Sequence, residues 1–224
     1  MDEERITSFI RSLYPPESEL LGRIRREALA DDVPIIRPET AALLRFLMEE
    51  RRPEKILEVG CATGYSSLVM YEALGGACSI TTIEKYEKRI PVAKAHFEEA
   101  GATGIALLEE DAGEAMERLI REGQSYDMIF MDAAKAQYIL WLPLVKQLLC
   151  PGGLLMSDNV LQDGDVTESR YVVTRRNRTI HARMREYLFA LTHDESLTST
   201  ILPVGDGVAL SVRKGEGSSG PSSD

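Results

Sequence analysis

Short apolar runs alternate with longer amphipathic stretches through the middle of the chain. Five runs have the length and composition of strands buried on both faces, and they span residues 55–59, 79–84, 105–109, 128–132 and 153–157. The stretches between them carry apolar residues at helical spacing, which predicts helices over residues 65–74, 88–100, 113–123 and 138–148. This alternation is typical of a doubly wound, mostly parallel α/β sheet.

Amphipathic helices also precede the first strand. Two are predicted between residues 3 and 30, separated by Pro15 and Pro16, because proline does not continue a helix. A third is predicted over residues 39–49. We expect residues 1–50 to form a helical cover whose apolar faces pack on the sheet or on a second copy of the chain, and we therefore predict a homodimer.

The end of the chain has a different pattern. A helix is predicted over residues 175–191, and the apolar runs 197–203 and 208–212 flank the turn Gly205-Asp206-Gly207 as an antiparallel hairpin. Residues 215–224 are rich in glycine and serine, which predicts a disordered tail. We interpret residues 1–214 as a single domain.

Composition narrows the class of protein. At 224 residues with 44% hydrophobic side chains, the chain can bury a sizeable core, and none of its apolar runs reaches the roughly 20 residues that span a bilayer. The first residues lack the basic start and apolar centre of a signal peptide. Three cysteines without a C-x-x-C pair disfavour disulfides and a zinc site. These features predict a cytoplasmic protein with no membrane partner.

The distribution of charge is uneven. A net charge of −10 argues against a nucleic-acid partner, yet residues 170–185 hold six arginines and no acidic residue. A local positive potential can attract a polyanion even when the total charge is negative. The simpler alternative is a solvated helix face.

A turn rich in small residues follows the first predicted strand. Gly60 and Gly64 let the backbone bend sharply and approach a ligand, because no Cβ is in the way. The spacing differs from the G-x-G-x-x-G of dinucleotide-binding proteins, which disfavours a nicotinamide dehydrogenase. Glu58 before the turn suits a ligand with a charged amino acid part, and Glu84 after the second strand could hold ribose hydroxyls. A βαβ turn without a ligand is the simpler alternative.

Polar side chains also follow the fourth and fifth predicted strands. Asp132 ends one strand, and Asp158 and Asn159 follow the other. Because the carboxyl ends of parallel strands meet at one edge of a sheet, we expect these oxygen ligands to lie close together, as Mg²⁺ requires. Lys135 is a candidate base, since a nearby cation would lower the pKa of its ammonium. The simpler alternatives are that Asp158 and Asn159 only form a turn, that Asp132 only caps a helix, and that Lys135 is an ordinary surface lysine.

Together these motifs resemble a known enzyme family. EVGCATGYSS and Glu84 resemble motif I and the following acidic residue of class I S-adenosylmethionine methyltransferases. With FMDAAKAQY and MSDNVL, the chain resembles the metal-dependent O-methyltransferases related to catechol and caffeoyl-CoA methyltransferases over about residues 35–212. The resemblance implies a Rossmann-like class I fold, S-adenosylmethionine as cofactor, and Mg²⁺ or another divalent cation.

The resemblance also implies roles for individual residues. The implied metal ligands are Asp132, Asp158 and Asn159, and Lys135 is the implied catalytic base. The residues implied to contact the cofactor are Ile36, Glu58, Gly60, Ser66, Glu84, Asp111, Ala112 and Asp132. A metal that chelates two adjacent substrate oxygens would stabilise the oxyanion that attacks the methyl group. A non-catalytic cofactor-binding module is the alternative, which Lys135 beside a complete ligand set disfavours.

Three further segments resemble one branch of the family, the bacterial tRNA 5-hydroxyuridine methyltransferases, which make 5-methoxyuridine at the wobble position. They are DDVPIIRPET, YVVTRRNRTIHARMREY and ILPVGDGVALSVRK. This likeness implies tRNA as the partner and Arg175, Arg176 and Arg178 as RNA-binding residues. The alternative is a small catechol or phenolic substrate. No segment corresponds recognisably to the insertion loop of plant caffeoyl-CoA enzymes, which disfavours a CoA ester.

Overall fold

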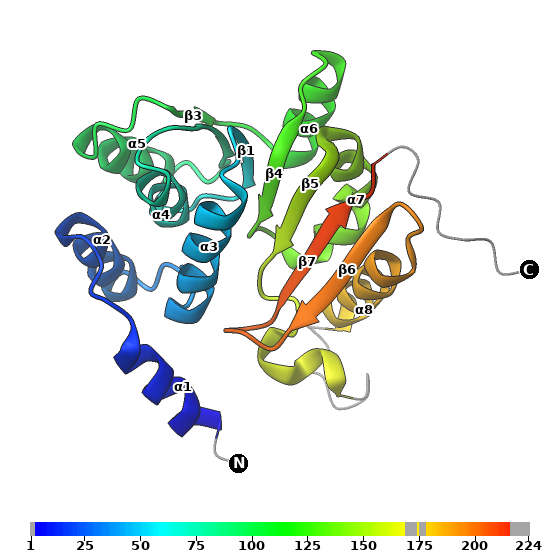
Figure 1. The fold of residues 1–224 in the computed structure, drawn as a ribbon, viewed down its shortest axis with the longest axis horizontal. Helices are drawn as coiled ribbons and strands as arrows, with labels where there is room; N and C mark the ends of the chain where they lie inside the picture. Colours follow the sequence, from blue (N-terminus) through cyan, green and yellow to red (C-terminus); the bar gives the residue numbers. More distant parts are fainter. Residues whose placement is uncertain (1–2, 169–173, 175–177, 216–224) are drawn as a thin grey trace, which may run out of the picture.

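A computed structural model describes residues 3–168, 174 and 178–215 of the chain. These residues form one seven-stranded sheet with helices on both faces (Figure 1). The predicted α/β fold, with a mostly parallel sheet and an antiparallel hairpin at its end, is confirmed. No helix within the described ranges is both long and apolar enough to cross a membrane.

The order of the strands is β3-β2-β1-β4-β5-β7-β6. The first five strands are parallel, whereas β7 runs antiparallel to β5 and β6. Because the chain moves outward from β1 to β3 and then returns to the other side of β1 with β4, the carboxyl ends of β1 and β4 flank the point where the winding reverses. Ligands bind at this point in open α/β sheets. The strands are β1 Lys55–Val59, β2 Ser79–Ile83, β3 Ile105–Leu108, β4 Tyr126–Met131, β5 Leu149–Ser157, β6 Leu197–Leu202 and β7 Val208–Arg213.

Alternating side chains of the strands build a core on each face of the sheet. Ile56 packs in a cluster with residues of α2–α5, whereas Leu57 and Val59 pack in a second cluster with residues of α6–α8. This is the period-2 pattern of a strand that is buried on both faces. The helices are α1 Glu3–Leu13, α2 Glu19–Ala30, α3 Pro38–Arg51, α4 Tyr65–Ala73, α5 Ile90–Glu99, α6 Ala112–Arg121, α7 Tyr138–Leu148 and α8 Arg178–His193, with the short 3₁₀ helices η1 Lys135–Gln137 and η2 Gln162–Thr167.

The predicted bounds differ from the observed ones mainly at β5 and α8. β5 begins at Leu149 instead of residue 153, and its pairing with β4 shifts register between Tyr126 and Met128. Pro151 is therefore part of this strand at an irregular point in the ladder, where a missing N–H is tolerated. α8 is described from Arg178, so the predicted helical residues 175–177 lie outside the described residues, as does most of the predicted disordered tail.

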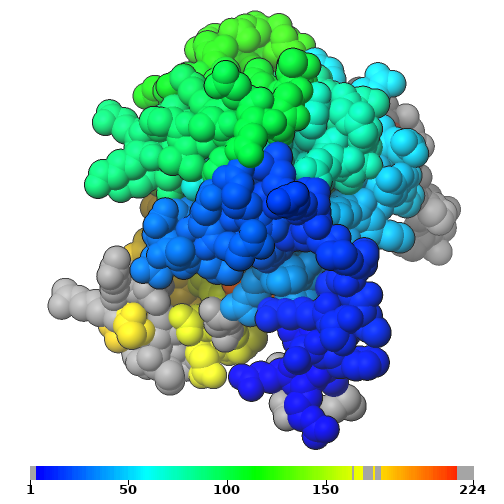
Figure 2. All heavy atoms as spheres, turned by 90° about the vertical axis from the view of Figure 1, so that its left-hand side faces the viewer, coloured from blue at the N-terminus to red at the C-terminus, as the bar shows by residue number. Residues whose placement is uncertain are grey.

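α1 projects from the rest of the molecule (Figures 1 and 2). Its predicted apolar stripe is present and faces solvent in the single chain, with Phe9 64% and Leu13 65% exposed. The predicted homodimer, in which a second copy would cover this stripe, stays a prediction.

Candidate active site

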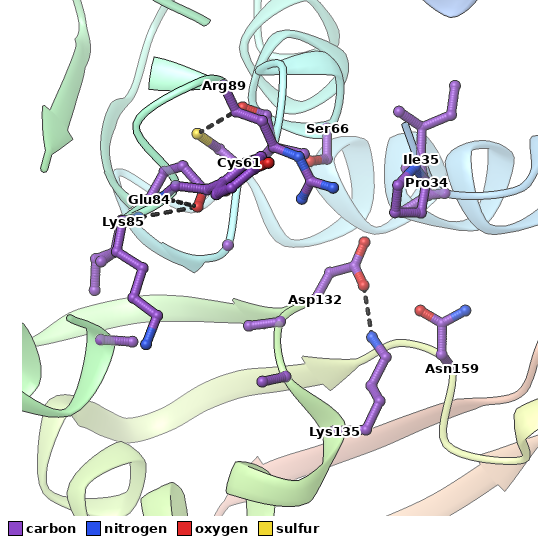
Figure 3. A pocket seen from close by; sticks show the side chains of 18 of the residues that line it. Pro34, Ile35, Cys61, Ser66, Glu84, Lys85, Arg89, Asp132, Lys135 and Asn159 are labelled. Carbon is purple, nitrogen blue, oxygen red and sulfur yellow. Dashed lines mark hydrogen bonds and ion pairs between the residues drawn. The ribbon is translucent and has the colours of Figure 1, made fainter. Parts of the chain in front are cut away.

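A cavity of about 850 Å³ opens at the carboxyl edge of the parallel strands (Figure 3). Most of the residues predicted to bind ligands line it, namely Ile36, Gly60, Ser66, Glu84, Asp111, Ala112, Asp132, Lys135 and Asn159. Two predicted residues, Glu58 and Asp158, are buried beside the cavity and are not among its lining residues. Arg175 and Arg176 lie outside the described residues, and the described Arg178 is not part of the lining.

Backbone pairing beyond the ends of the strands brings these segments together. The N–H of Gly60 donates to Ile83 O at 3.0 Å, and the N–H of Asp132 donates to Val59 O at 3.0 Å. The N–H of Asp158 donates to Met131 O, also at 3.0 Å. The ladder between neighbouring strands thus continues one residue past each of these strands, which fixes the loops at the floor of the cavity.

The glycine turn needs its glycines for two reasons. Gly60 has a φ of 92°, and a Cβ on it would lie 2.5 Å from the carbonyl oxygen of Asp132. Gly64 has a φ of 83°, and a Cβ on it would lie 2.5 Å from the ring of Phe97. Left-handed backbone together with close packing excludes larger side chains at both positions. The turn is therefore held close to β4 and α5.

Glu58 stands behind this turn. Its carboxylate is fully buried and accepts hydrogen bonds from the hydroxyls of Ser66 at 2.6 Å, Thr82 at 2.5 Å, and Ser67. Burial raises the pKa of Glu58 to about 7, although the three hydroxyls oppose the shift. The side chain thus ties the start of α4 to β1 and β2, and it acts on the cavity through Ser66, which lines it.

Glu84 and Asp111 also present carboxylates to the cavity. Glu84 accepts hydrogen bonds from the backbone N–H of Ala62, Lys85 and Tyr86 at 2.8–2.9 Å. Asp111 caps α6 through the N–H of Gly113 at 2.9 Å and pairs with Lys85 Nζ at 2.8 Å. Both carboxylates are thereby fixed in orientation, as a site that holds a polar cofactor requires.

A second group of polar side chains lies at the ends of β4 and β5. Lys135 Nζ donates to Asp132 Oδ1 at 2.7 Å and to Tyr138 Oη at 3.1 Å. Burial alone lowers the pKa of Lys135, but the oxygens of Asp132 and Tyr138 outweigh burial, so the pKa of this ammonium lies above its ordinary value. The lowered pKa predicted for Lys135 refers to a protein with bound cation and stays a prediction.

Asp158 is a buried carboxylate of the site with one unpartnered oxygen. It is 1% exposed, and its Oδ1 has no hydrogen-bond partner among the described residues. Burial and, next, the negative charge of Asp132 raise the pKa of Asp158. A buried carboxylate oxygen without a donor, beside a second carboxylate and an amide, fits the requirements of a hard cation. The described residues contain no cluster of three or more His, Cys, Asp and Glu that could hold a metal, so any such site depends on Asn159 as its third protein ligand.

A side-chain network that the sequence did not predict supports the glycine turn from outside. Tyr65 lines the cavity, and its hydroxyl is hydrogen-bonded to Glu17 and Arg25. Glu17 also pairs with Arg25 at 2.9 Å and with Arg45 at 3.0 Å, and the Arg25 guanidinium lies 4.8 Å from the centre of the Tyr65 ring. The only sequence signal was the tyrosine in GYSS, because the partners come from three other segments of the chain.

We expect Glu17→Gln to lower the free energy of unfolding by about 2 kcal/mol at pH 7. Burial alone raises the pKa of Glu17, but hydrogen bonds from Arg25, Tyr65 and Arg45 outweigh it and lower the pKa to about 2. The stabilisation is therefore present above the ordinary pKa of 4.5 and is lost as the pH falls toward 2. Urea unfolding at pH 7 and pH 3 measures this difference. Glu4→Gln, at an exposed position, is the control, and an equal effect of both substitutions would refute the prediction.

Comparisons with known proteins identify a family for the chain. Residues 11–214 match the family model described as O-methyltransferase. A caffeoyl-CoA O-methyltransferase from Stellaria longipes is 28% identical over 221 residues, which cover 94% of this chain and 90% of that protein. A catechol O-methyltransferase from Niastella koreensis is 30% identical over 169 residues, which cover 74% of this chain and 76% of that protein.

A solved structure with bound cofactor is also similar. The O-methyltransferase TomG from Streptomyces achromogenes, in complex with S-adenosylmethionine, superposes with a TM-score of 0.82 and 26% sequence identity. The match covers 96% of this chain and 100% of that chain.

Proposed function

The chain belongs to the O-methyltransferase family as an S-adenosylmethionine-dependent enzyme of the caffeoyl-CoA and catechol type, and from this premise we propose that it methylates one of two adjacent oxygens on a ring with the help of a divalent cation. One observation carries the proposal: the unpartnered buried oxygen of Asp158 beside Asp132 and Asn159, at the edge of the large cavity. Hard oxygen ligands of this kind suit Mg²⁺, which takes its remaining oxygens from substrate and water.

The cofactor would lie along the glycine turn. Gly60 and Ser66 would approach it closely, while the carboxylate of Glu84 would accept hydrogen bonds from its ribose hydroxyls. Ile36, Asp111 and Ala112 complete this side of the cavity. Bound S-adenosylmethionine supplies an electrophilic methyl group, and a bound cation supplies charge that stabilises the substrate oxyanion. The chain itself contributes orientation of both reactants and exclusion of water.

Lys135 would handle the proton of the substrate hydroxyl. Its Nζ lies at the edge of the cavity, within hydrogen-bond distance of the Asp132 carboxylate and the Tyr138 hydroxyl. These two hydrogen bonds fix the position of the Lys135 ammonium group before any substrate binds. In the protein with a bound cation, whose charge would lower the pKa of Lys135, a neutral Lys135 amine would accept the hydroxyl proton, and the charge it gains would be balanced by Asp132.

We propose tRNA that carries 5-hydroxyuridine as the substrate, with 5-methoxyuridine as the product. The support is the arginine-rich segment of the sequence, residues 170–185, together with the contacts of α8, which contains the last three of its arginines. Arg183 donates to Ala136 O at 3.0 Å and Arg185 donates to Val166 O at 2.8 Å, so α8 lies against η1 and η2, which contribute Gln137 and Gln162 to the cavity wall. A polyanion bound at the start of α8 would thus lie on a helix that packs against the elements of the cavity wall.

A small catechol or phenol is the second candidate substrate. The observation that favours it is the 30% identity with the catechol O-methyltransferase of Niastella koreensis. A catechol presents two adjacent oxygens, as 5-hydroxyuridine does, so the same site chemistry serves both substrates.

Methyl transfer from labelled S-adenosylmethionine tests these proposals. The substrates are tRNA with 5-hydroxyuridine and free catechol, each with Mg²⁺ and with a chelator. Label in tRNA that requires Mg²⁺ and far exceeds the label in catechol supports the RNA substrate. Label in catechol alone would refute the RNA substrate and support a small catechol or phenol as the substrate. Label that is unaffected by the chelator overturns the role of the cation.

Charge reversal in the arginine segment tests the RNA substrate separately. We expect Arg175→Glu, Arg176→Glu and Arg178→Glu together to lower kcat/KM for tRNA at least about tenfold, because phosphate contacts are lost. Affinity for S-adenosylmethionine should not change. A control variant reverses three exposed arginines on other elements, at positions 26, 52 and 121. Equal kcat/KM in the two variants would contradict the prediction.

A further inference from the structure

The turn between β6 and β7 is held against the segment that follows β5 by backbone hydrogen bonds and close packing. The N–H of Val160 donates to Gly207 O at 3.0 Å, and the N–H of Leu161 donates to Asp206 O at 2.9 Å. A Cβ on Gly207 would collide with the Leu161 side chain, at a φ of 87°. A Cβ on Gly205 would lie 2.5 Å from Thr40 Oγ1 at the start of α3. The glycines therefore fix the position of the residue between them, Asp206.

Asp206 reaches the cavity from this fixed turn. Its side chain is 15% exposed and belongs to the lining of the cavity. One carboxylate oxygen accepts a hydrogen bond from Asn159 Nδ2 at 2.9 Å, and the other forms an ion pair with Arg37. Arg37 directly precedes α3 and follows Ile36, so Asp206 joins three segments that are distant in sequence. The positive charge of Arg37 compensates the largely buried carboxylate.

The hydrogen bond to Asp206 selects one orientation of the Asn159 amide. A carboxylate only accepts hydrogen bonds, whereas an amide has a donor end and an acceptor end. Asp206 therefore engages the NH₂ group of Asn159 and leaves the amide oxygen on the other side. Figure 3 shows this oxygen on the side of Asp132 and Lys135. In the reverse orientation two acceptors would face each other, and the NH₂ group would point at the place of a cation.

We propose that Asp206 is a positioning residue for the divalent cation, because it holds Asn159 with its amide oxygen on the side of Asp132, which with Asp158 supplies the acidic ligands. The inference rests on the proposed function, in which these three residues hold the cation. Partners that orient metal ligands typically change metal affinity by about 10–100-fold when they are removed. Asp206 acts on the cation through Asn159 and through the fixed turn.

Binding of Mn²⁺, followed by electron paramagnetic resonance, is the test, with binding of S-adenosylmethionine followed by calorimetry. We expect Asp206→Asn to weaken Mn²⁺ binding about tenfold, because an asparagine no longer selects the NH₂ end of Asn159. The double variant Asn159→Asp with Asp206→Asn reverses the pair: the new amide donates to the new carboxylate, whose second oxygen remains for the cation. We expect this exchange to restore most of the affinity for Mn²⁺.

The controls separate this inference from the proposed function. Asp31→Asn removes one exposed negative charge outside the cavity and should leave Mn²⁺ affinity unchanged. If the wild-type protein binds no Mn²⁺, the cation of the proposed function is refuted and the inference with it. If the wild type binds Mn²⁺ and Asp206→Asn binds it as tightly, the inference alone is overturned. Loss of S-adenosylmethionine binding in Asp206→Asn, without recovery of Mn²⁺ binding in the double variant, would show a structural role and also overturn it.

Discussion

Lys135→Met is expected to lower kcat about 10³-fold, while affinity for S-adenosylmethionine changes less than about twofold. The reason is that the substitution removes the group proposed to take the hydroxyl proton, whereas the turn proposed to hold the cofactor is formed by other segments. Asp132 and Tyr138 accept hydrogen bonds from the Lys135 ammonium and raise its pKa above the ordinary value, so its role as a base requires that the proposed cation lower this pKa. Single-turnover methyl transfer measures the chemical step.

Lys135→Arg is the matched variant that distinguishes a base from a mere positive charge. Arginine retains the charge and can pair with Asp132, but it does not lose its proton in proteins. If Lys135 accepts a proton, arginine should be nearly as inactive as methionine at this position. Substantial activity of Lys135→Arg would show that only the charge is needed. Unchanged kcat in Lys135→Met would remove the residue from the mechanism.

The fold and most of the cavity could be predicted because their signals are local. Gly60 and Gly64 mark the turn, and each polar residue at a strand end immediately follows its apolar run. Parallel pairing then brings these ends to one edge, as the hydrogen bond from the Asp132 N–H to Val59 O shows. The chain order of the elements therefore sufficed to place Asp132 and Asn159 at one cavity, 27 residues apart in the sequence.

Contacts between distant segments could not be predicted in this way. Glu58 has the sequence position of a cofactor-binding residue, but Ser66, Ser67 and Thr82 surround its carboxylate only after α4 and β2 have packed on β1. The sequence around Asp206 predicts only a turn, since its partner Asn159 is 47 residues away. Side-chain partners across the sheet depend on packing that a single sequence does not display.

Glu58 should make the stability of the protein depend on pH. Its pKa is about 7 in the folded protein and near the ordinary 4.5 in the unfolded chain, because burial disfavours the charged form. Between these values the folded protein holds a proton that the unfolded chain has released. The free energy of unfolding therefore falls as pH rises from about 4.5 through 7, by about 3 kcal/mol in total. Urea unfolding between pH 5 and pH 8 measures this slope.

Glu58→Gln isolates this contribution, because glutamine resembles the protonated carboxyl in size and hydrogen bonding but does not titrate. Asp158 also has a raised pKa, so the wild-type slope alone does not identify the group responsible. Subtracting the free energy of unfolding of Glu58→Gln from that of the wild type cancels the other groups, and we expect this difference to fall by about 2.5 kcal/mol between pH 5 and pH 8. Parallel curves would mean that Glu58 stays ionised behind the turn. In that case the three hydroxyl donors would outweigh burial and keep the pKa of Glu58 near its ordinary value. The start of α4 would then be hydrogen-bonded to a carboxylate that is ionised at neutral pH.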